Sequence, residues 1–375
     1  MNEQIRSLFP VTNNFIYMNH SAVAPLSTRV RDAMTELVAD VTENGSASFE
    51  RWYATQEQAR RGAGVLVNAK PHEIAFMRNT SEGIAALANG IDWREGDNCV
   101  TCNVEFPSNM YPWLRLEAER GIKVKTAIER EGRIDPEELF ALVDERTKVL
   151  TLSWVQFSSG FRSDLRRIGR FCRERGVLFV IDAIQGLGGL KLDVERDYVD
   201  AFAADAHKYL LGPEGIALLY ISDRVIEKIR PVVVGWTSFK NYTDYLDYDL
   251  SFREGAARFE YGTLNTVGIY GINAALNLFL EIGTGGIEEY LIGLTDYLVE
   301  RLASKGYVIT SSRRPGEASA MVTCTHPVYK PMELFRLLMS KRIVTAPRVG
   351  KLRISPHIYN TRAEVDELIS ALPEG

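Results

Sequence analysis

VLFVIDAIQGLGGLKLDVERDYVDAFAADAHKYLLGPEG, residues 177–215, is the stretch that decides the fold of this chain. It opens with an apolar run, Val177–Ile181, which is short enough to form a strand buried on both faces. That run ends on Asp182, and a second expected strand, 199–204, ends shortly before Lys208. Ligands gather at the carboxyl ends of strands in an open parallel sheet, so we expect Asp182 and Lys208 to face one crevice.

An acid and a lysine in one crevice match the needs of a particular cofactor. Pyridoxal 5′-phosphate requires a lysine for its Schiff base and a carboxylate at its pyridinium nitrogen. The sequence around both residues therefore predicts a site for this cofactor. Lys208 is preceded by His207, and a turn-rich Gly212-Pro213-Glu214-Gly215 leads into the apolar run 216–220.

Strands and helices alternate on the N-terminal side of this stretch. Such βα alternation predicts an α/β fold with a mostly parallel sheet that is covered by helices on both faces. After about Gly255 the pattern changes to long helices and a few short strands, which predicts an α+β domain. The expected strands lie at 73–77, 98–101, 123–128 and 148–154, and the expected helices begin at Thr80, near Ser108, at Asp135, at Ser163, at Thr266 and at Ile287.

The composition excludes several classes of protein. The net charge of -5 over 375 residues gives no basic footprint, so we expect no nucleic-acid partner. No apolar run reaches the length of a membrane span, and the first residues lack the apolar core of a secretory signal, so a cytoplasmic location is expected. Cys99 and Cys102 form a C-x-x-C pair within an expected strand, where they point to opposite faces as core thiols, and no metal site is expected.

The motifs around Lys208 point to a known family. His207-Lys208 followed by Gly-Pro-x-Gly, and Asp182 followed by Gln185, resemble the fold-type I pyridoxal-phosphate enzymes and, within them, the class V aminotransferase group. That group includes cysteine desulfurases, isopenicillin N epimerase-like proteins and related C–S lyases. Matching motifs run from about Tyr17 to Thr361. The resemblance implies a three-layer large domain (16–255), a smaller α+β domain (256–375) onto which residues 1–15 pack, and a homodimer with a shared active site.

The resemblance also implies the catalytic roles. Lys208 is expected to hold the cofactor as an internal aldimine and then to move the substrate's α-proton, for which it must be neutral. Asp182 is expected to keep the pyridine nitrogen protonated, and Gln185 to donate a hydrogen bond to the phenolic oxygen. His207 is expected to orient the lysine or to meet the phosphate.

Two segments match the phosphate-binding motifs of the family. Arg78-Asn79-Thr80-Ser81-Glu82-Gly83 lies between a strand and a helix, where free N–H groups and the hydroxyls of Thr80 and Ser81 suit a phosphate. Arg258-Phe259-Glu260-Tyr261-Gly262-Thr263 resembles the R-F-E-x-G-T motif, whose Gly-Thr reaches the neighbouring subunit's phosphate in relatives. Gly262 and Thr263 are therefore expected to complete a partner's site. The plainer interpretation of both segments is an ordinary helix cap.

The remaining site residues follow from the same resemblance. Phe106 occupies the position at which desulfurases carry a histidine stacked on the pyridine ring, so we expect it to stack without moving protons. Arg353, in the Leu352-Arg353-Ile354-Ser355-Pro356 segment, is expected to bind the substrate's α-carboxylate. Asn19 and His20 are expected to line the substrate pocket.

Three departures from the family pattern affect the predicted function. Residues 343–351 contain no cysteine, although desulfurases carry a persulfide-forming cysteine on a loop shortly before the carboxylate arginine. Phe157 occupies the position of an asparagine near the phenolic oxygen. Asp205 stands where many relatives have a small hydroxyl beside the phosphate, and an acid there repels a phosphate unless it is paired or turned away.

We therefore predict a homodimeric enzyme that acts on a small α-amino acid, with class V transamination first, C–S or β-elimination lyase second and epimerisation third. Two other hypotheses stay open. One is a nucleotide-binding oxidoreductase, suggested by Gly186-Leu187-Gly188-Gly189, although Lys191 stands where the last glycine of G-x-G-x-x-G belongs. The other is an inactive scaffold that has kept the fold for binding alone.

Overall fold

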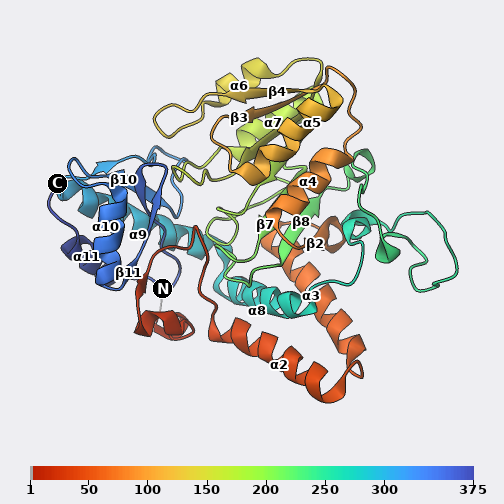
Figure 1. Cartoon of the computed structure of the whole chain (residues 1–375), viewed down its shortest axis with the longest axis horizontal. Coiled ribbons are helices and arrows are strands. Elements are labelled where there is room, and N and C mark those ends of the chain that lie inside the picture. Colours follow the sequence, from red (N-terminus) through yellow and green to blue (C-terminus); the bar gives the residue numbers. More distant parts are fainter. Residues whose placement is uncertain (1–2) are drawn as a thin grey trace.

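The computed structural model describes residues 3–375, and its centre is a seven-stranded sheet with the order β2-β8-β7-β6-β5-β3-β4 (Figure 1). Only β8 runs antiparallel to its neighbours, so the predicted, mostly parallel sheet is confirmed. The strands are β2 (Ile74–Met77), β3 (Asn98–Cys102), β4 (Lys123–Ala127), β5 (Thr147–Ser153), β6 (Leu178–Asp182), β7 (Ala201–Asp205) and β8 (Ala217–Ile221).

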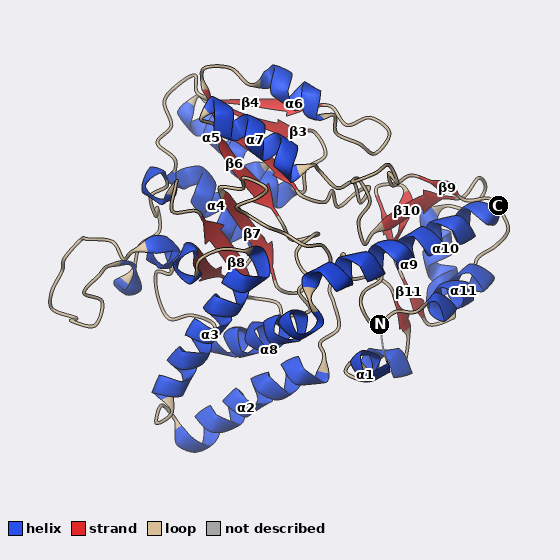
Figure 2. Cartoon of the chain, turned by 180° about the vertical axis from the view of Figure 1, so that it is seen from behind, coloured by secondary structure: helices blue, strands red, loops and turns tan. Residues whose placement is uncertain are grey.

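Helices cover both faces of this sheet because its strands are apolar on both sides. In β6, Phe179 and Ile181 enter one hydrophobic cluster with helices α3, α6, α7 and α8, whereas Leu178 and Val180 enter another with α4 and α5. Figure 2 shows these layers from behind. The helices are α1 (Glu3–Arg6), α2 (Thr28–Asn44), α3 (Phe49–Val67), α4 (Thr80–Gly90), α5 (Tyr111–Arg120), α6 (Pro136–Leu142), α7 (Leu165–Arg175), α8 (Thr266–Ile282), α9 (Thr284–Ser304), α10 (Pro331–Ser340) and α11 (Arg362–Ala371).

Two details of the sheet bear on the sequence analysis. Cys99 and Cys102 lie in β3 and enter different hydrophobic clusters, as expected for side chains on opposite faces. The helix expected near Ser108 begins later, at Tyr111, because Pro107–Asn109 form a separate 3₁₀ turn.

The C-terminal part builds a second, antiparallel sheet of order β12-β13-β10-β9. A third hydrophobic cluster lies between this sheet and helices α9, α10 and α11. Strand β1 (Ile16–Tyr17) pairs with β11 (Ile343–Val344), so residue 16, which the predicted boundary assigns to the large domain, pairs with the C-terminal part; the domain division itself stays a prediction. The other strands are β9 (Val308–Ile309), β10 (Val322–Thr325), β12 (Ala346–Arg348) and β13 (Lys351–Ile354).

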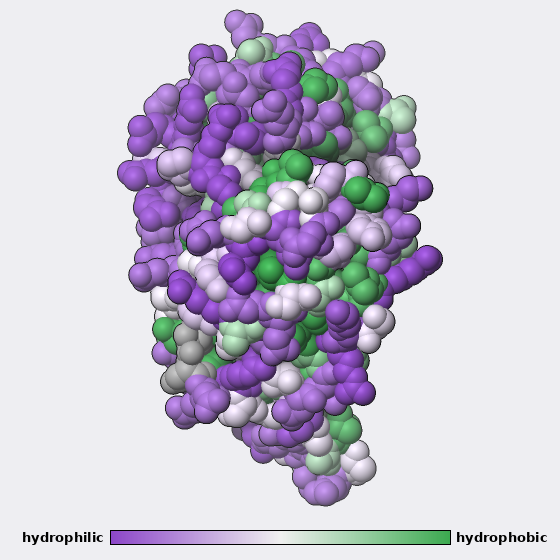
Figure 3. Space-filling view, turned by 90° about the vertical axis from the view of Figure 1, so that its left-hand side faces the viewer, coloured by the Kyte–Doolittle hydropathy of each residue, from purple (hydrophilic) through white to green (hydrophobic). Residues whose placement is uncertain are grey.

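The N-terminal segment is held against the C-terminal part by polar contacts. Arg6 donates to the Tyr359 carbonyl at 2.8 Å and forms an ion pair with Glu364, also at 2.8 Å. These contacts concern part of the segment 1–15, of which residues 1–2 lie outside the described residues. The end of the molecule that carries the C-terminal part presents mostly hydrophilic residues with hydrophobic patches between them (Figure 3).

Within residues 3–375, no single helix is long and apolar enough to cross a membrane. The pair α8 and α9 meets the length and composition criteria only when the two helices are taken together, and they are bent by 82° at their junction.

Candidate active site

Five strands of the large sheet, with the antiparallel β8 between two of them, place the residues that follow them along one edge. The directions of β2, β7, β6, β5 and β3 are the same, so their carboxyl ends meet there. Polar residues follow these ends: Thr80 and Ser81 after β2, His207 and Lys208 after β7, Gln185 after β6, Gln156 after β5, and Glu105 and Ser108 after β3; Asp205, Asp182 and Ser153 are themselves last residues of strands. This is the edge at which ligands gather in α/β sheets.

Lys208 lies at the centre of this edge and is only 9% exposed. Its Nζ stands 5.6 Å from the centroid of the Phe106 ring. Burial lowers the pKa of Lys208, and the charge of Asp182 partly opposes this shift. Near neutral pH, the fraction of the amine that is neutral is therefore larger for Lys208 than for an exposed lysine. The turn that presents it, closed by the Leu211 N–H to the Lys208 carbonyl at 3.0 Å, holds Leu211 in the left-handed region at φ 54°.

Asp182 is 2% exposed, and its carboxylate accepts one hydrogen bond, from the Ile184 N–H at 3.0 Å. Burial raises the pKa of Asp182, while the Ile184 N–H and the charge of Lys208 act in the opposite direction. The neighbouring acids Glu105 and Asp205 raise it further. A buried carboxylate with so few donors fits a cationic partner such as a protonated pyridine nitrogen. Asp182 and Lys208 thus interact within one site, as predicted.

Arg353 is a buried arginine with most of its hydrogen-bonding capacity free. It is 1% exposed, and its Nη1 donates to the Phe157 carbonyl at 3.1 Å. Its Nε and Nη2 have no partner in the described chain. Burial lowers the pKa of Arg353 to about 10, and the charge of Arg348 adds to this effect. A fixed guanidinium with two free donors is suited to grip a carboxylate.

Four more buried polar atoms near this edge have no hydrogen-bond partner among the described residues: Asn19 Oδ1, Gln156 Oε1, Gln185 Oε1 and His207 Nδ1, the last of which lies 3.5 Å from Asp205 Oδ1. Gln185 Nε2 already donates to the Ser21 carbonyl at 3.1 Å. Buried polar groups are normally hydrogen-bonded, so such a group of unpartnered atoms indicates a place for a polar ligand. The residues present therefore fit a ligand with the polarity of pyridoxal 5′-phosphate.

The predicted phosphate contact of Thr80 needs a correction. Its N–H and hydroxyl both donate to Asp205 Oδ2, at 2.9 and 3.0 Å, so neither donor is free for a phosphate. The same contacts hold the Asp205 carboxylate in place, but because both groups of Thr80 are uncharged, they do not cancel its negative charge. The Ser81 hydroxyl lies 2.6 Å from the Ser108 hydroxyl, a neighbour that sequence reasoning missed, and the phosphate contact of Ser81 stays a prediction.

His20 also differs from its predicted role. Its side chain is fully buried, with Nδ1 2.8 Å from the Ser355 carbonyl and Nε2 2.7 Å from the Tyr359 hydroxyl. Burial lowers the pKa of His20 well below its ordinary value. Both ring nitrogens are engaged, so His20 supports the wall of the site and has no nitrogen left for a substrate.

In the single chain, Gly262 and Thr263 belong to a cavity whose lining does not include Lys208. They line a cavity of about 430 Å³ together with aromatic side chains, among them Trp52, Tyr53 and Trp236. Glu260 of the same motif is buried and accepts from the Arg60 Nη1 at 2.9 Å and from the Phe76 N–H at 2.9 Å. The glutamate of the motif is thus structural: it fixes the segment that carries Gly262 and Thr263.

Sequence reasoning also missed Arg348. Strands β12 and β13 pair Ala346 with Arg353 and Arg348 with Lys351, and directly paired residues point to the same face of a sheet. Arg348 therefore shares a face with Arg353, and its charge lowers the pKa of Lys208 as well. Within the described chain it has no ion-pair partner. The only feature of the sequence that points to Arg348 is its position in the segment 343–351, shortly before Arg353.

The glycines that suggested a nucleotide-binding oxidoreductase have a packing role. A Cβ at Gly188, where φ is 98°, would lie 2.1 Å from the Tyr209 carbonyl oxygen. A Cβ at Gly186 would lie 2.3 Å from the Trp154 ring. The glycines thus let the backbone after Lys208 pack closely against this loop.

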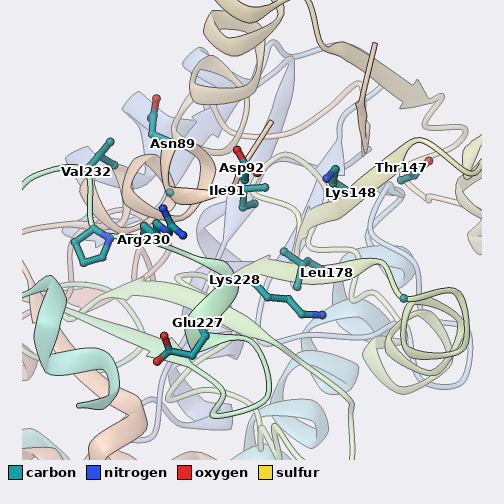
Figure 4. A pocket seen from close by; sticks show the side chains of 13 residues that line it. Asn89, Ile91, Asp92, Thr147, Lys148, Leu178, Glu227, Lys228, Arg230 and Val232 are labelled. Atoms are coloured by element: carbon teal, nitrogen blue, oxygen red, sulfur yellow. The ribbon is translucent and has the colours of Figure 1, made fainter. Parts of the chain in front are cut away.

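A cavity of about 650 Å³ lies at the opposite edge of the sheet (Figure 4). Its lining includes Thr147 and Leu178, the first residues of β5 and β6, with the charged side chains of Asp92, Lys148 and Lys228 around them. None of the predicted site residues lines it. Because it lies at the amino ends of these strands, we place the candidate site at the carboxyl edge.

The fold and this site define a class of protein: an α/β enzyme with a buried lysine of lowered pKa, a buried acid and a buried arginine with two unpartnered nitrogens at the carboxyl edge of its sheet. The chain belongs to the class-V aminotransferase family, whose model matches residues 16–368. It is accordingly an enzyme of the pyridoxal-phosphate class, as the sequence predicts.

Comparison with individual proteins supports the same assignment. The chain is 32% identical to a probable cysteine desulfurase of Methanothermobacter thermautotrophicus, over 99% of this chain and 97% of that protein. It is 26% identical to the uncharacterized aminotransferase YcbU of Bacillus subtilis, over 99% and 97% of the two chains. Its structure is similar to that of an apo cysteine desulfurase from Thermococcus onnurineus, with a TM-score of 0.90, 25% identity, and coverage of 99% and 96%.

Proposed function

We propose that this enzyme cleaves the C–S bond of a small sulfur-containing α-amino acid by β-elimination, with pyridoxal 5′-phosphate as its cofactor. The observation that carries the proposal is Arg353: a buried guanidinium with two free nitrogens, in the same site as Lys208 and Asp182. The choice of a C–S bond is supported by the 32% identity to a probable cysteine desulfurase. Transamination, which the sequence analysis ranks first, is our second candidate for the reaction. The similarity to YcbU supports it.

The proposed reaction assigns a role to each residue of the site. When bound, the cofactor withdraws electrons from the substrate's Cα. Arg353 binds the α-carboxylate and so fixes the Cα–H bond relative to Lys208, whose neutral Nζ removes the α-proton. With the cofactor bound, Asp182 would supply a negative charge for the pyridine nitrogen, Gln185 and Ser81 would bind the phenolic and phosphate oxygens, and Phe106 would contact the ring. The Cβ–S bond then breaks, and sulfur leaves with the bonding electron pair.

The cysteines of this chain favour elimination over persulfide chemistry. All four, Cys99, Cys102, Cys172 and Cys324, are buried, and burial raises the pKa of each thiol. A buried thiol of raised pKa is a poor nucleophile. The sulfur therefore leaves as sulfide, and hydrolysis of the remaining three-carbon fragment gives pyruvate and ammonia.

Product analysis tests this proposal. Purified enzyme loaded with the cofactor is given L-cysteine, and pyruvate, sulfide, ammonia and alanine are quantified. We expect pyruvate, sulfide and ammonia in equal amounts. Alanine in place of pyruvate indicates desulfurase chemistry, transfer of the amino group to a 2-oxo acid indicates a transaminase, and a D-amino acid indicates an epimerase. No cofactor binding in any of these assays would favour the inactive scaffold.

We also propose the homodimer with a shared active site, in which Gly262 and Thr263 reach the partner's phosphate. Its support is the apolar surface beside them. The exposed Trp236 lines the same cavity, the exposed Tyr245 lies against it with ring centroids 6.1 Å apart, and large exposed apolar patches mark interaction surfaces. The cytoplasmic location and the absence of nucleic-acid and membrane partners stay predictions from the sequence.

Replacing Arg353 tests the carboxylate contact. We expect Arg353→Ala to lower kcat/KM about 100-fold, because hydrogen bonds to charged groups contribute about 1.5–3 kcal/mol each. Arg353→Lys keeps the charge but loses the planar fork, so we expect it to recover only part of this loss. Steady-state kinetics measure both, with Arg362→Ala on α11 as the control. Unchanged kinetics in Arg353→Ala would remove Arg353 from the substrate site.

A further inference from the structure

Asp205 binds the first residue of α4 through three hydrogen bonds. Its Oδ2 accepts the N–H and the hydroxyl of Thr80, at 2.9 and 3.0 Å. Its own N–H donates to the Thr80 hydroxyl at 2.9 Å. The Asp205 side chain is 8% exposed, and its Oδ1 lies 3.5 Å from His207 Nδ1. The last residue of β7 is therefore joined to the start of α4 by a buried carboxylate.

These contacts leave little of the α4 N-terminus free. Of its first three N–H groups, that of Thr80 bonds to Asp205 and that of Glu82 bonds to Asn79 Oδ1 at 2.8 Å. Only the Ser81 N–H has no partner in the described chain. A negative charge at a helix N-terminus offsets the partial positive charge of the helix end. The anion-binding position at the start of α4 is thus partly occupied by an anion of the protein itself.

We propose that Asp205 is an internal anion that stabilises the start of α4 in the apo protein and weakens the binding of the cofactor's phosphate. This inference rests on the proposed function, because it takes the phosphate to bind at Ser81 and His207. The phosphate arrives beside a carboxylate that already uses the two donors of Thr80, so it meets like-charge repulsion and finds fewer N–H and O–H groups. The holoenzyme then exchanges its cofactor more readily than one with a neutral residue at position 205.

A binding experiment with two ligands isolates the charge. Apo wild type and apo Asp205→Asn are titrated with pyridoxal 5′-phosphate and, separately, with pyridoxal, which lacks the phosphate; the absorbance of the bound aldehyde gives each Kd. The amide keeps the shape of the side chain and an acceptor for the Thr80 N–H. We expect Asp205→Asn to bind pyridoxal 5′-phosphate about tenfold more tightly, which is about 1.4 kcal/mol, and to bind pyridoxal within about twofold of wild type.

Two outcomes would overturn the inference. One is an unchanged or weaker affinity of Asp205→Asn for pyridoxal 5′-phosphate. The other is the same gain for both ligands, since the phosphate would then not be the group that Asp205 opposes. Neither outcome touches the proposed function, which fails only if wild type itself binds neither ligand, and the inference then fails with it.

Thermal unfolding of the apo proteins checks the other half of the inference. We expect apo Asp205→Asn to melt about 2–4 °C below apo wild type, because the α4 N-terminus loses its compensating charge. Asp205→Ser, which also removes the acceptor for Thr80, should melt lower still. An apo Asp205→Asn protein that melts at or above the wild-type temperature would contradict the stabilising role of Asp205.

Discussion

Lys208→Ala is expected to abolish both the covalent link to the cofactor and nearly all turnover. In the proposed function, this side chain supplies both the amine that joins the aldehyde of the cofactor and the base that moves the α-proton. Positioned acid–base catalysis alone contributes about 10²–10⁴-fold, so we expect kcat to fall by at least about 10³-fold. The burial that lowers the pKa of Lys208 keeps this amine available as a base.

Borohydride reduction followed by mass spectrometry measures the covalent link directly. Wild type should carry the reduced cofactor on Lys208, and Lys208→Ala should carry none. Lys228→Ala, at the opposite edge of the sheet, is the matched control and should keep both the link and the activity (Figure 4). A Lys208→Ala protein with normal turnover would refute the assignment of this lysine.

Asp182→Asn is expected to separate cofactor binding from catalysis. The amide has nearly the same volume but no charge, so it cannot hold a proton on the pyridine nitrogen. Lys208 is intact in this variant, so the covalent link should still form. Removing one preorganised electrostatic group costs about 10²–10³-fold in kcat, and we expect a loss of that size.

Exchange of the substrate's Cα proton with deuterium from the solvent, followed by NMR, reports on this step without requiring the C–S bond to break. We expect the exchange rate to fall in parallel with kcat in Asp182→Asn. Asp92→Asn, in the cavity at the amino edge, serves as control. Normal exchange in Asp182→Asn would mean that the acid has a structural role only.

The environment of Asp182 in the structure explains why its charge depends on a bound partner. In the described chain its pKa is raised, chiefly by burial, and one backbone N–H is its hydrogen-bond donor. A pyridinium nitrogen beside it would supply the missing positive charge and lower the pKa again. The site is thus arranged for an acid that becomes charged when its cationic partner binds.

Several features of this protein could be predicted because they depend on local sequence. The apolar run 177–181 ends on Asp182, and the buried strand β7 is followed by His207 and Lys208. Buried strands of a parallel sheet read as continuous apolar runs, and their carboxyl ends share one edge. The fold class and the shared edge of Asp182 and Lys208 follow from these two rules. The family follows from the motifs around Lys208 and Asp182.

The tertiary structure decided the features that depend on contacts between distant residues. Thr80 and Asp205 are 125 residues apart, and only the pairing of β2, β8 and β7 brings them together and takes the donors of Thr80 away from a phosphate. The hydrogen bonds that occupy both ring nitrogens of His20 are made with Ser355 and Tyr359, which lie 335 and 339 positions further along the chain. By itself the sequence determined which residues follow the strand ends; which of their atoms stay free for a ligand is set by long-range packing, because a hydrogen bond depends on where both partners lie in space.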